Sequence, residues 1–267
     1  RKDIENLSLP FVGEIPLKTD AGKNKSTHTN KSIVIKQGSR DIINEAFRVL
    51  RTNLEFMLDA KIENKASVTL FTSFNPGSGK SFLTMNTAAT FAMKGKRILV
   101  IDGDLRRGSA SAYLGSQHKG LSDYLGKRES CLDALVQENP DIPGFFLLPA
   151  GTIPPNPTEL LAEPLFKETI EQLRGHYDYI LIDCPPIDIV ADTQIIEKLA
   201  DRTVFVVRAG LLERDMLSEL QRMYDEKRFK NMALLLNGTE GGGNRYGYRY
   251  GYKYGYKYGY GSKNYYK

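Results

Sequence analysis

The feature that most constrains this chain is the stretch from Val68 to Ser81, which reads VTLFTSFNPGSGKS. Apolar and β-branched residues, typical of a buried strand, give way to a loop rich in Pro and Gly that ends in Gly79-Lys80-Ser81. Apolar side chains then recur at helical spacing, at Phe82, Leu83, Met85, Ala88 and Ala89. This order predicts a strand, a phosphate-binding loop and a helix.

A loop of this kind binds the phosphates of a nucleotide because its backbone N–H groups and the positive end of the following helix point at the anion. We expect Lys80 to reach the outer phosphates and the Ser81 hydroxyl to hold Mg²⁺. The predicted nucleotide-binding residues are Gly77, Ser78, Gly79, Lys80, Ser81 and Phe82. One departure from a standard P-loop is Phe74, which stands where the first Gly is expected.

The rest of the chain alternates predicted strands and helices. Apolar strands are predicted at 97–101, 145–148, 179–182, 203–207 and 232–236, and helices at 41–58, 121–136, 156–174 and 213–229. The alternation predicts an α/β fold, a parallel sheet with helices on both faces, and the phosphate loop makes it a P-loop NTPase fold. Ligands of such sheets bind at the carboxyl ends of the strands.

Acidic residues end two of these strands. Asp183 stands where a Walker B acid does, and Asp102 and Asp104 follow another strand within DGDLRR. Phosphoryl transfer needs a held metal ion and an oriented nucleophile, so Asp183 and Ser81 can hold Mg²⁺, and the extra acidic pair suggests a substrate with a hydroxyl group. By sequence alone, Asp183 can also be a turn residue before Pro-Pro, and DGDLRR a surface loop.

Length and composition indicate one substantial core with extensions. Two cysteines, Cys131 and Cys184, make neither a disulfide framework nor a metal motif, which favours a reducing, cytosolic setting. No apolar run approaches the roughly 18 residues that span a bilayer. We expect a lead-in and linker at 1–40, a P-loop domain at 41–240 and a flexible tail at 241–267.

The tail is of low complexity and basic. It holds six basic side chains and no acidic one, so without it the net charge falls from +5 to −1, which argues against a nucleic-acid-binding surface on the globular part. We expect the tail to be disordered because it can bury little apolar surface, although a sticky β-strand or binding of single-stranded nucleic acid are alternatives. Ten of the fifteen tyrosines lie in it: Tyr246, Tyr248, Tyr250, Tyr252, Tyr254, Tyr256, Tyr258, Tyr260, Tyr265 and Tyr266.

These segments together resemble the cytoplasmic domain of the bacterial tyrosine kinases, the BY-kinases attached to polysaccharide co-polymerases in capsule and exopolysaccharide export. The resemblance covers nearly the whole chain, in order. Its motifs are EAFRVLRTNL (45–54), FTSFNPGSGKS (71–81), ILVIDGDLRRG (98–108), GLSDYL (120–125), NPTELL (156–161), ILIDCPP (180–186), VVRAG (206–210), LLLNG (234–238) and the terminal tyrosine cluster.

The resemblance implies a role for each matching residue of the site. Lys80 and Ser81 match the Walker A lysine and its metal-binding hydroxyl, and Asp183 matches the Walker B acid. Asp102 and Asp104 match the extra Walker A′ acids, of which the first would accept or orient the tyrosine hydroxyl and the second would support Mg²⁺.

Two further assignments follow from the resemblance. Asn237 lies where related folds contact adenine. Glu45, Arg48 and Arg51 match a motif associated with assembly into a ring, whereas their spacing alone favours a solvated helix face with a weak ion pair.

The resemblance implies a protein-tyrosine kinase that uses ATP and Mg²⁺ to phosphorylate its tail tyrosines between subunits and so regulates polysaccharide synthesis and export. Expected partners are further copies in a ring, a membrane co-polymerase segment on the same chain or on a separate activator, and a tyrosine phosphatase, with no nucleic acid. The lead-in would be juxtamembrane, and this soluble fragment would work at the cytoplasmic face of the inner membrane, with transmembrane helices upstream in the full protein.

The main alternative is a ParA- or MinD-like ATPase switch without kinase activity, on the same fold. Such proteins usually carry an additional signature lysine early in the P-loop, where this chain has Phe74-Asn75-Pro76. A nucleic-acid-binding ATPase would depend on the tail alone.

Overall fold

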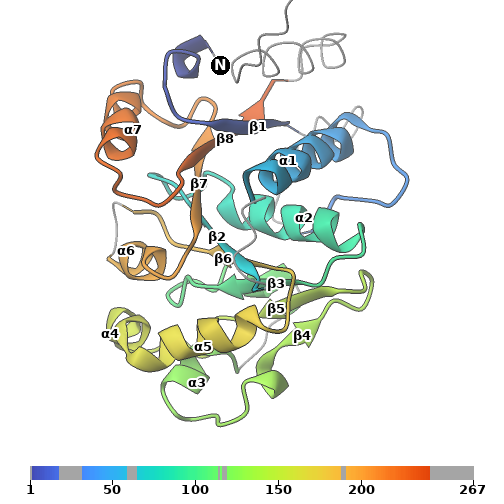
Figure 1. The fold of residues 1–267 in the computed structure, drawn as a ribbon, viewed down its shortest axis with the longest axis vertical. Helices are drawn as coiled ribbons and strands as arrows, with labels where there is room; N and C mark the ends of the chain where they lie inside the picture. The colour runs from blue at the N-terminus through green and yellow to red at the C-terminus, as the bar shows by residue number, and fades with distance from the viewer. Residues whose placement is uncertain are drawn as a thin grey trace, which may run out of the picture.

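One mixed sheet organises the fold (Figure 1). The computed structural model describes residues 2–17, 32–58, 65–113, 115, 119–187 and 191–240. The strand order is β1-β8-β7-β2-β6-β3-β5-β4, and all neighbours run parallel except β4 and β5 at one edge. The strands are β1 (Phe11–Pro16), β2 (Ser67–Thr72), β3 (Ile98–Asp102), β4 (Gln137–Glu138), β5 (Phe145–Leu148), β6 (Tyr179–Asp183), β7 (Arg202–Arg208) and β8 (Ala233–Thr239).

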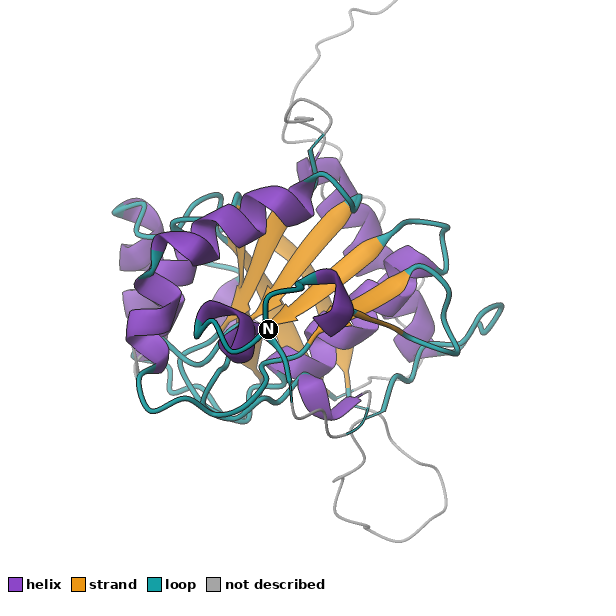
Figure 2. Ribbon diagram, turned by 90° about the horizontal axis from the view of Figure 1, so that it is seen from below, coloured by secondary structure: helices purple, strands orange, loops and turns teal. Residues whose placement is uncertain are grey.

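Helices cover both faces of this sheet (Figure 2). One face packs against α1 and α2, and the other packs against α3 to α7. The predicted α/β class and P-loop NTPase fold are therefore confirmed. The helices are α1 (Ile42–Leu58), α2 (Lys80–Ala92), α3 (Leu121–Leu125), α4 (Pro157–Ala162), α5 (Pro164–Arg174), α6 (Asp192–Glu197) and α7 (Met216–Asp225).

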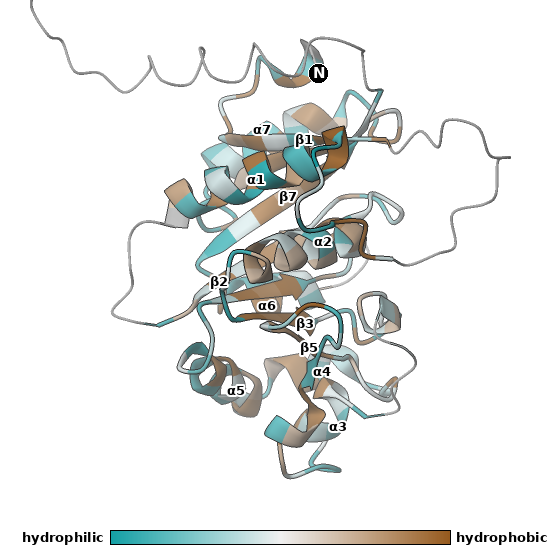
Figure 3. Ribbon diagram, turned by 90° about the vertical axis from the view of Figure 1, so that its right-hand side faces the viewer, coloured by the Kyte–Doolittle hydropathy of each residue, from teal (hydrophilic) through white to brown (hydrophobic). Residues whose placement is uncertain are grey.

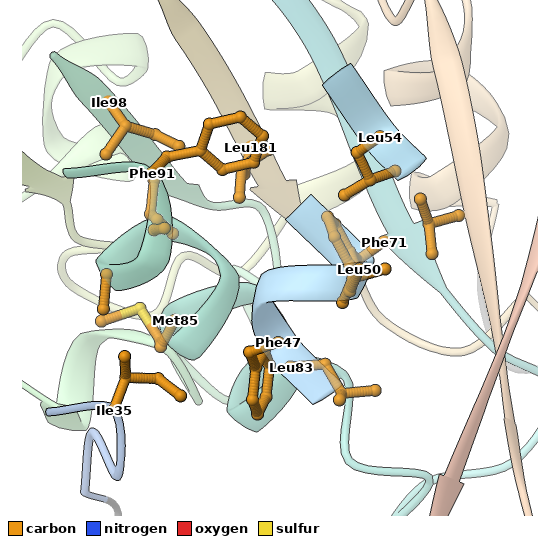
Figure 4. Packing of buried hydrophobic residues seen from close by; sticks show 14 of the residues in the cluster. Ile35, Phe47, Leu50, Leu54, Phe71, Leu83, Met85, Phe91, Ile98 and Leu181 are labelled. Carbon is orange, nitrogen blue, oxygen red and sulfur yellow. The ribbon is translucent and has the colours of Figure 1, made fainter. Parts of the chain in front are cut away.

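Alternation along the strands builds an apolar layer on each face. In β3, Ile98 and Val100 belong to the cluster under α1 and α2, while Leu99 and Ile101 belong to the cluster under the opposite helices. The period is two because successive side chains of a strand point to opposite faces. Figure 4 shows the first cluster, in which side chains from both helices pack on the strands, and Figure 3 shows the hydrophobic colour gathered on the central strands.

The helix predicted at 121–136 is wrong for most of its length. Helix α3 ends at Leu125 with Gly126 as its C-cap, and the next residue, Lys127, has a left-handed backbone with φ of 56°. That conformation does not continue a right-handed helix. A 3₁₀ turn at Asp133–Leu135 and the edge strand β4 occupy the remainder.

The helix predicted at 156–174 is broken in two. Glu163 separates α4 from α5 with an extended backbone, at φ −64° and ψ 143°. The break has a local cause: Pro164 follows, and the residue before a proline is pushed out of the helical region by the proline ring. Helix α4 begins with Asn156 at its N-cap position, where the side chain makes no capping hydrogen bond within the described residues.

Part of the predicted lead-in belongs to the sheet. Strand β1 pairs in parallel with β8, and its Val12 and Ile15 are buried in the cluster under α1 and α2. The amide of Asn53 in α1 donates to the Val12 carbonyl at 2.8 Å, which ties this edge strand to the helix above it. The sequence showed only an apolar patch here, since a single strand carries no signal for its partner.

Two other expectations concern the ends of the chain. No helix in the described part is long and apolar enough to cross a membrane. The tail, with all of its predicted acceptor tyrosines, lies outside the described residues.

Phe74 lies at the start of the phosphate loop and anchors the loop in a third apolar cluster. Its side chain is 3% exposed and packs with residues of β7, β8 and α7. The ring meets that of Phe205 at a centroid distance of 4.8 Å and an interplanar angle of 62°, an edge-to-face arrangement that aromatic pairs favour. An aromatic anchor thus stands where a standard loop has its first glycine.

We expect Phe74→Ala to lower the free energy of unfolding by about 3–5 kcal/mol, because it leaves a cavity in this cluster. Denaturant unfolding followed by circular dichroism measures the loss. The control is Phe56→Ala, which removes a ring that is 73% exposed on α1 and should change the stability by no more than about 0.5 kcal/mol. Equal losses in the two variants would contradict the anchoring role.

Candidate active site

The phosphate loop connects β2 to α2 at the carboxyl edge of the sheet. Gly77 and Gly79 both have positive φ, of 76° and 93°. At Gly79 a Cβ would also overlap the side-chain amide of Asn237, so this position requires glycine. Helix α2 begins without a side-chain cap or an acidic residue in its first turn. Its positive end can therefore act on a bound anion.

The other predicted loop residues shape the loop or pack beneath it. The Ser78 hydroxyl donates to the Asn75 carbonyl at 2.8 Å and closes the turn. Phe82 is half-buried between α1 and α2, where its ring lies 6.0 Å from that of Phe47. A contact of Phe82 with the nucleotide stays a prediction.

Lys80 points back into the loop. Its ammonium group donates to the Ser73 hydroxyl at 3.1 Å, and the residue is 9% exposed. Burial lowers the pKa of Lys80, although the charges of Asp183 and Asp104 oppose this shift. A phosphate group next to Lys80 would stabilise its charged form and so oppose the effect of burial on its pKa.

The register of the sheet brings two of the predicted acids together. β3 and β6 pair so that Asp102 stands directly opposite Asp183. Burial, followed by the negative charge of Asp102, raises the pKa of Asp183 to about 8, while a hydrogen bond with Ser81 works against the rise. Two neighbouring carboxyl groups and a lysine are thus held in a site that excludes water.

The remaining acids complete the edge. Asp102 is fully buried, and burial raises its pKa to about 6 although hydrogen bonds from Ser111 oppose the rise. Asp104 lies in the loop after β3 and is 7% exposed. Its Oδ1 accepts the backbone N–H groups of Arg106 at 3.2 Å and Arg107 at 3.1 Å, which fixes the loop in a tight turn.

The residues present fit a magnesium ion that binds together with a nucleotide. The Oδ1 atom of Asp183 is buried and has no hydrogen-bond partner among the described residues, and a buried oxygen of this kind is costly unless a ligand meets it. In the described part of the chain, no three His, Cys, Asp or Glu side chains gather to hold a metal by themselves. Mg²⁺ rarely needs such a cage, because it takes one or two carboxylates plus phosphate oxygens and water.

Asn237, near the carboxyl end of β8, contacts the phosphate loop. Its side-chain amide donates to the Ser78 carbonyl at 2.8 Å. Arg208, the last residue of β7, was not singled out from the sequence. Its guanidinium donates to the Gly77 carbonyl at a distance of 2.8 Å. Both residues brace the loop, while the contact of Asn237 with adenine stays a prediction.

A second group that sequence reasoning missed surrounds Arg106. Its guanidinium donates to Asp192 Oδ2 at 2.9 Å and to the Thr158 hydroxyl at 2.9 Å, and Thr158 donates to the other Asp192 oxygen at 2.6 Å. Asp192 is fully buried. The group joins the loop after β3 to α4 and α6. This contact gives the threonine of NPTELL, Thr158, its part in the structure.

The stripe on α1 is not part of the nucleotide site. Arg48 forms an ion pair with Glu45 and donates to the Ser39 carbonyl at 2.6 Å. Arg51 donates to the Thr90 carbonyl at 3.2 Å, near the carboxyl end of α2, where a positive charge is favourable. A role of this stripe in a subunit interface stays a prediction.

Fold and site together define a P-loop NTPase with an additional acidic loop beside its nucleotide site. In agreement with this class, residues 67–225 match the family model described as an AAA domain.

Curated relatives narrow the class. The chain is 32% identical over 219 residues to the tyrosine-protein kinase YwqD of Bacillus subtilis, a match that covers 82% of this chain and 90% of the relative. It is 38% identical over 241 residues to AmsA of Erwinia amylovora, which covers 85% of this chain but 32% of AmsA, so the chain spans about a third of that relative. The chain belongs to the family of bacterial tyrosine-protein kinases.

Solved structures agree with this family. The kinase domain of the Escherichia coli tyrosine kinase ETK superposes with a TM-score of 0.77 at 29% identity, over 93% of this chain and 98% of that one. MinD of Pyrococcus horikoshii, complexed with Mg-ADP, superposes with a TM-score of 0.52 at 23% identity, over 68% and 71% of the two chains. The MinD likeness is one of fold alone.

We expect Asp183→Asn to stabilise the nucleotide-free protein. Because the folded state raises the pKa of Asp183 to about 8, it holds a proton that the unfolded chain releases near pH 4. Wild-type stability should therefore fall as pH rises from about 4 to 8, and the variant should lose part of this slope. Melting temperatures across that range test this, at roughly 2–4 °C for each kcal/mol regained.

The matched control is Asp133→Asn, at an exposed position in a 3₁₀ turn, which should leave the pH slope as in the wild type. If Asp183→Asn melts at the wild-type temperature at both pH 5 and pH 8, the carboxyl group carries no burial penalty and the expectation is wrong.

Proposed function

We propose that this chain is an ATP-dependent protein-tyrosine autokinase that phosphorylates the tyrosine-rich tail of a neighbouring subunit and thereby regulates capsule or exopolysaccharide synthesis and export. The observation that carries the proposal is the acidic edge beside the phosphate loop. Hydrolysis needs one group to orient water, whereas in this site Asp102 and Asp104 lie beside Asp183. The chain is also similar to tyrosine-protein kinases. An additional carboxylate suits an acceptor hydroxyl.

The chain's own residues would divide the work as follows. Lys80 and the loop amides hold the phosphates in line for transfer, and Ser81, Asp183 and Asp104 hold the metal ion. When bound there, Mg²⁺ would supply positive charge that offsets the negative charge developing during transfer. The buried Oδ1 of Asp183, which has no hydrogen-bond partner among the described residues, and the phosphate loop beside it support ATP and Mg²⁺ as the cofactors.

Asp102 would orient the tyrosine hydroxyl and accept its proton. A general base works best when its pKa approaches the working pH while it still remains ionised. With a pKa of about 6, Asp102 is a stronger base than an ordinary aspartate and is still mostly ionised at pH 7. Burial therefore tunes this carboxylate toward the task.

The tail is the proposed acceptor because of its reach and its charge. About 25 flexible residues have a root-mean-square span on the order of 25–30 Å, which permits contact with an adjacent subunit. Its six basic side chains would be attracted to the acidic edge of that subunit. Glu45, Arg48 and Arg51 are the proposed ring contacts, with a co-polymerase segment at the cytoplasmic face of the inner membrane and a tyrosine phosphatase as further partners.

The test is incubation of the protein with radiolabelled ATP and Mg²⁺, with Lys80→Met and a truncation after residue 240 alongside. We expect phosphotyrosine that is stable in the wild type, absent in Lys80→Met, and lost from the truncated protein although it still binds ATP. Lys94→Met, beyond the far end of α2, is the matched lysine control and should stay active. Release of free phosphate without phosphotyrosine would instead support the MinD-like switch.

A further inference from the structure

Ser111 makes two hydrogen bonds to one oxygen of Asp102. Its backbone N–H donates to Asp102 Oδ2 at 2.7 Å, and its hydroxyl donates to the same atom at 2.6 Å. Ser111 opens the 3₁₀ turn Ser111–Tyr113, nine residues beyond the strand end that carries Asp102. Such short hydrogen bonds to a buried carboxylate are strong, because the carboxylate is charged and is not solvated by water.

The far side of Ser111 is tied to the loop after β5. The backbone N–H of Ala150 donates to the Ser111 hydroxyl oxygen at 2.9 Å. A serine hydroxyl has a single proton, and since Ala150 already donates to its oxygen, that proton is directed to Asp102. The orientation of the hydroxyl is thereby determined from both sides.

The loop that holds Ser111 is itself held by the GLSDYL motif. The N–H of Ser122 donates to the Ala150 carbonyl at 2.9 Å. Asp123 Oδ2 accepts the N–H groups of Gly120 at 2.9 Å and Thr152 at 3.0 Å. A continuous set of hydrogen bonds therefore runs from α3 through Ala150 and Ser111 to Asp102, which gives this motif a physical link to the site.

The two oxygens of Asp102 differ as a result. Oδ2 is occupied by both groups of Ser111, whereas Oδ1 accepts only the N–H of Asp104, at a long 3.3 Å, among the described residues. Lone-pair capacity for an incoming hydroxyl therefore remains at Oδ1.

We propose that Ser111 is a positioning residue for phosphoryl transfer, which holds Asp102 by Oδ2 so that Oδ1 receives the acceptor tyrosine. The inference rests on the proposed kinase function. In the step it serves, the tyrosine proton passes to Oδ1 and the tyrosine oxygen bonds to the γ-phosphorus. The bond from that phosphorus to the bridging oxygen breaks, and ADP leaves with the electron pair.

The experiment compares Ser111→Ala, Ser111→Thr and Ser109→Ala as full chains, with kcat and KM for ATP measured from tail phosphorylation. We expect Ser111→Ala to lower kcat at least tenfold and leave KM within about twofold, because a displaced base affects transfer but not nucleotide binding. Ser111→Thr, which keeps the hydroxyl, should recover at least half of kcat. Ser109 makes no hydrogen bond to Asp102 within the described residues, and its variant should match the wild type.

Other outcomes overturn the inference. They are a Ser111→Ala enzyme with wild-type kcat, a KM that rises along with the fall in kcat, or a threonine variant no better than alanine. If Ser111→Ala melts well below the wild type, Ser111→Cys replaces it, since a thiol is nearly isosteric but a weak donor, and the same limits apply. Absence of phosphotyrosine in the wild type would overturn the proposed function itself, whereas an active wild type with an equally active Ser111→Ala overturns only the role of Ser111.

Discussion

The pairing of β3 with β6 is the constraint on which the site depends. Its register sets Asp102 opposite Asp183 at the edge where the phosphate loop ends, and parallel strands deliver all their carboxyl ends to that edge. A shift of one residue would turn every side chain of β3 to the other face. Both faces of β3 are apolar, so the main consequence of such a shift would be at the strand end, where Asp102 would no longer stand opposite Asp183.

That arrangement opposes stability, because two carboxyl groups and a lysine share an interior that excludes water. The raised pKa of Asp183 and the lowered pKa of Lys80 both reflect the cost of burying these charged groups. Around it the chain places rigid supports: the Phe74 anchor, the Arg106–Asp192 contact and the braces from Asn237 and Arg208. These contacts surround the polar cluster, in which a bound Mg²⁺ would offset the charge of the carboxylates and a phosphate group that of Lys80.

Much of the fold could be predicted from sequence because its signals are local. The strands at 97–101 and 179–182 are short apolar runs, and the helix after Lys80 follows a loop with its own composition. The predictions for 121–136 and 156–174 went wrong where a single backbone angle decided the matter, at Lys127 and at Glu163 before Pro164. Strand β1 was missed because its pairing with β8 depends on a partner more than 200 residues away.

The sequence by itself determined the class of chemistry, because that chemistry depends on residue types: Lys80, Ser81 and the aspartates at 102, 104 and 183. Only the tertiary structure decided how they meet. It left an oxygen of Asp183 without a partner in the described part of the chain, placed Phe74 in a cluster with β7, β8 and α7, and brought Ser111 against Asp102. These contacts join segments whose spacing follows no helical or strand period, so their geometry exists only after the sheet has formed.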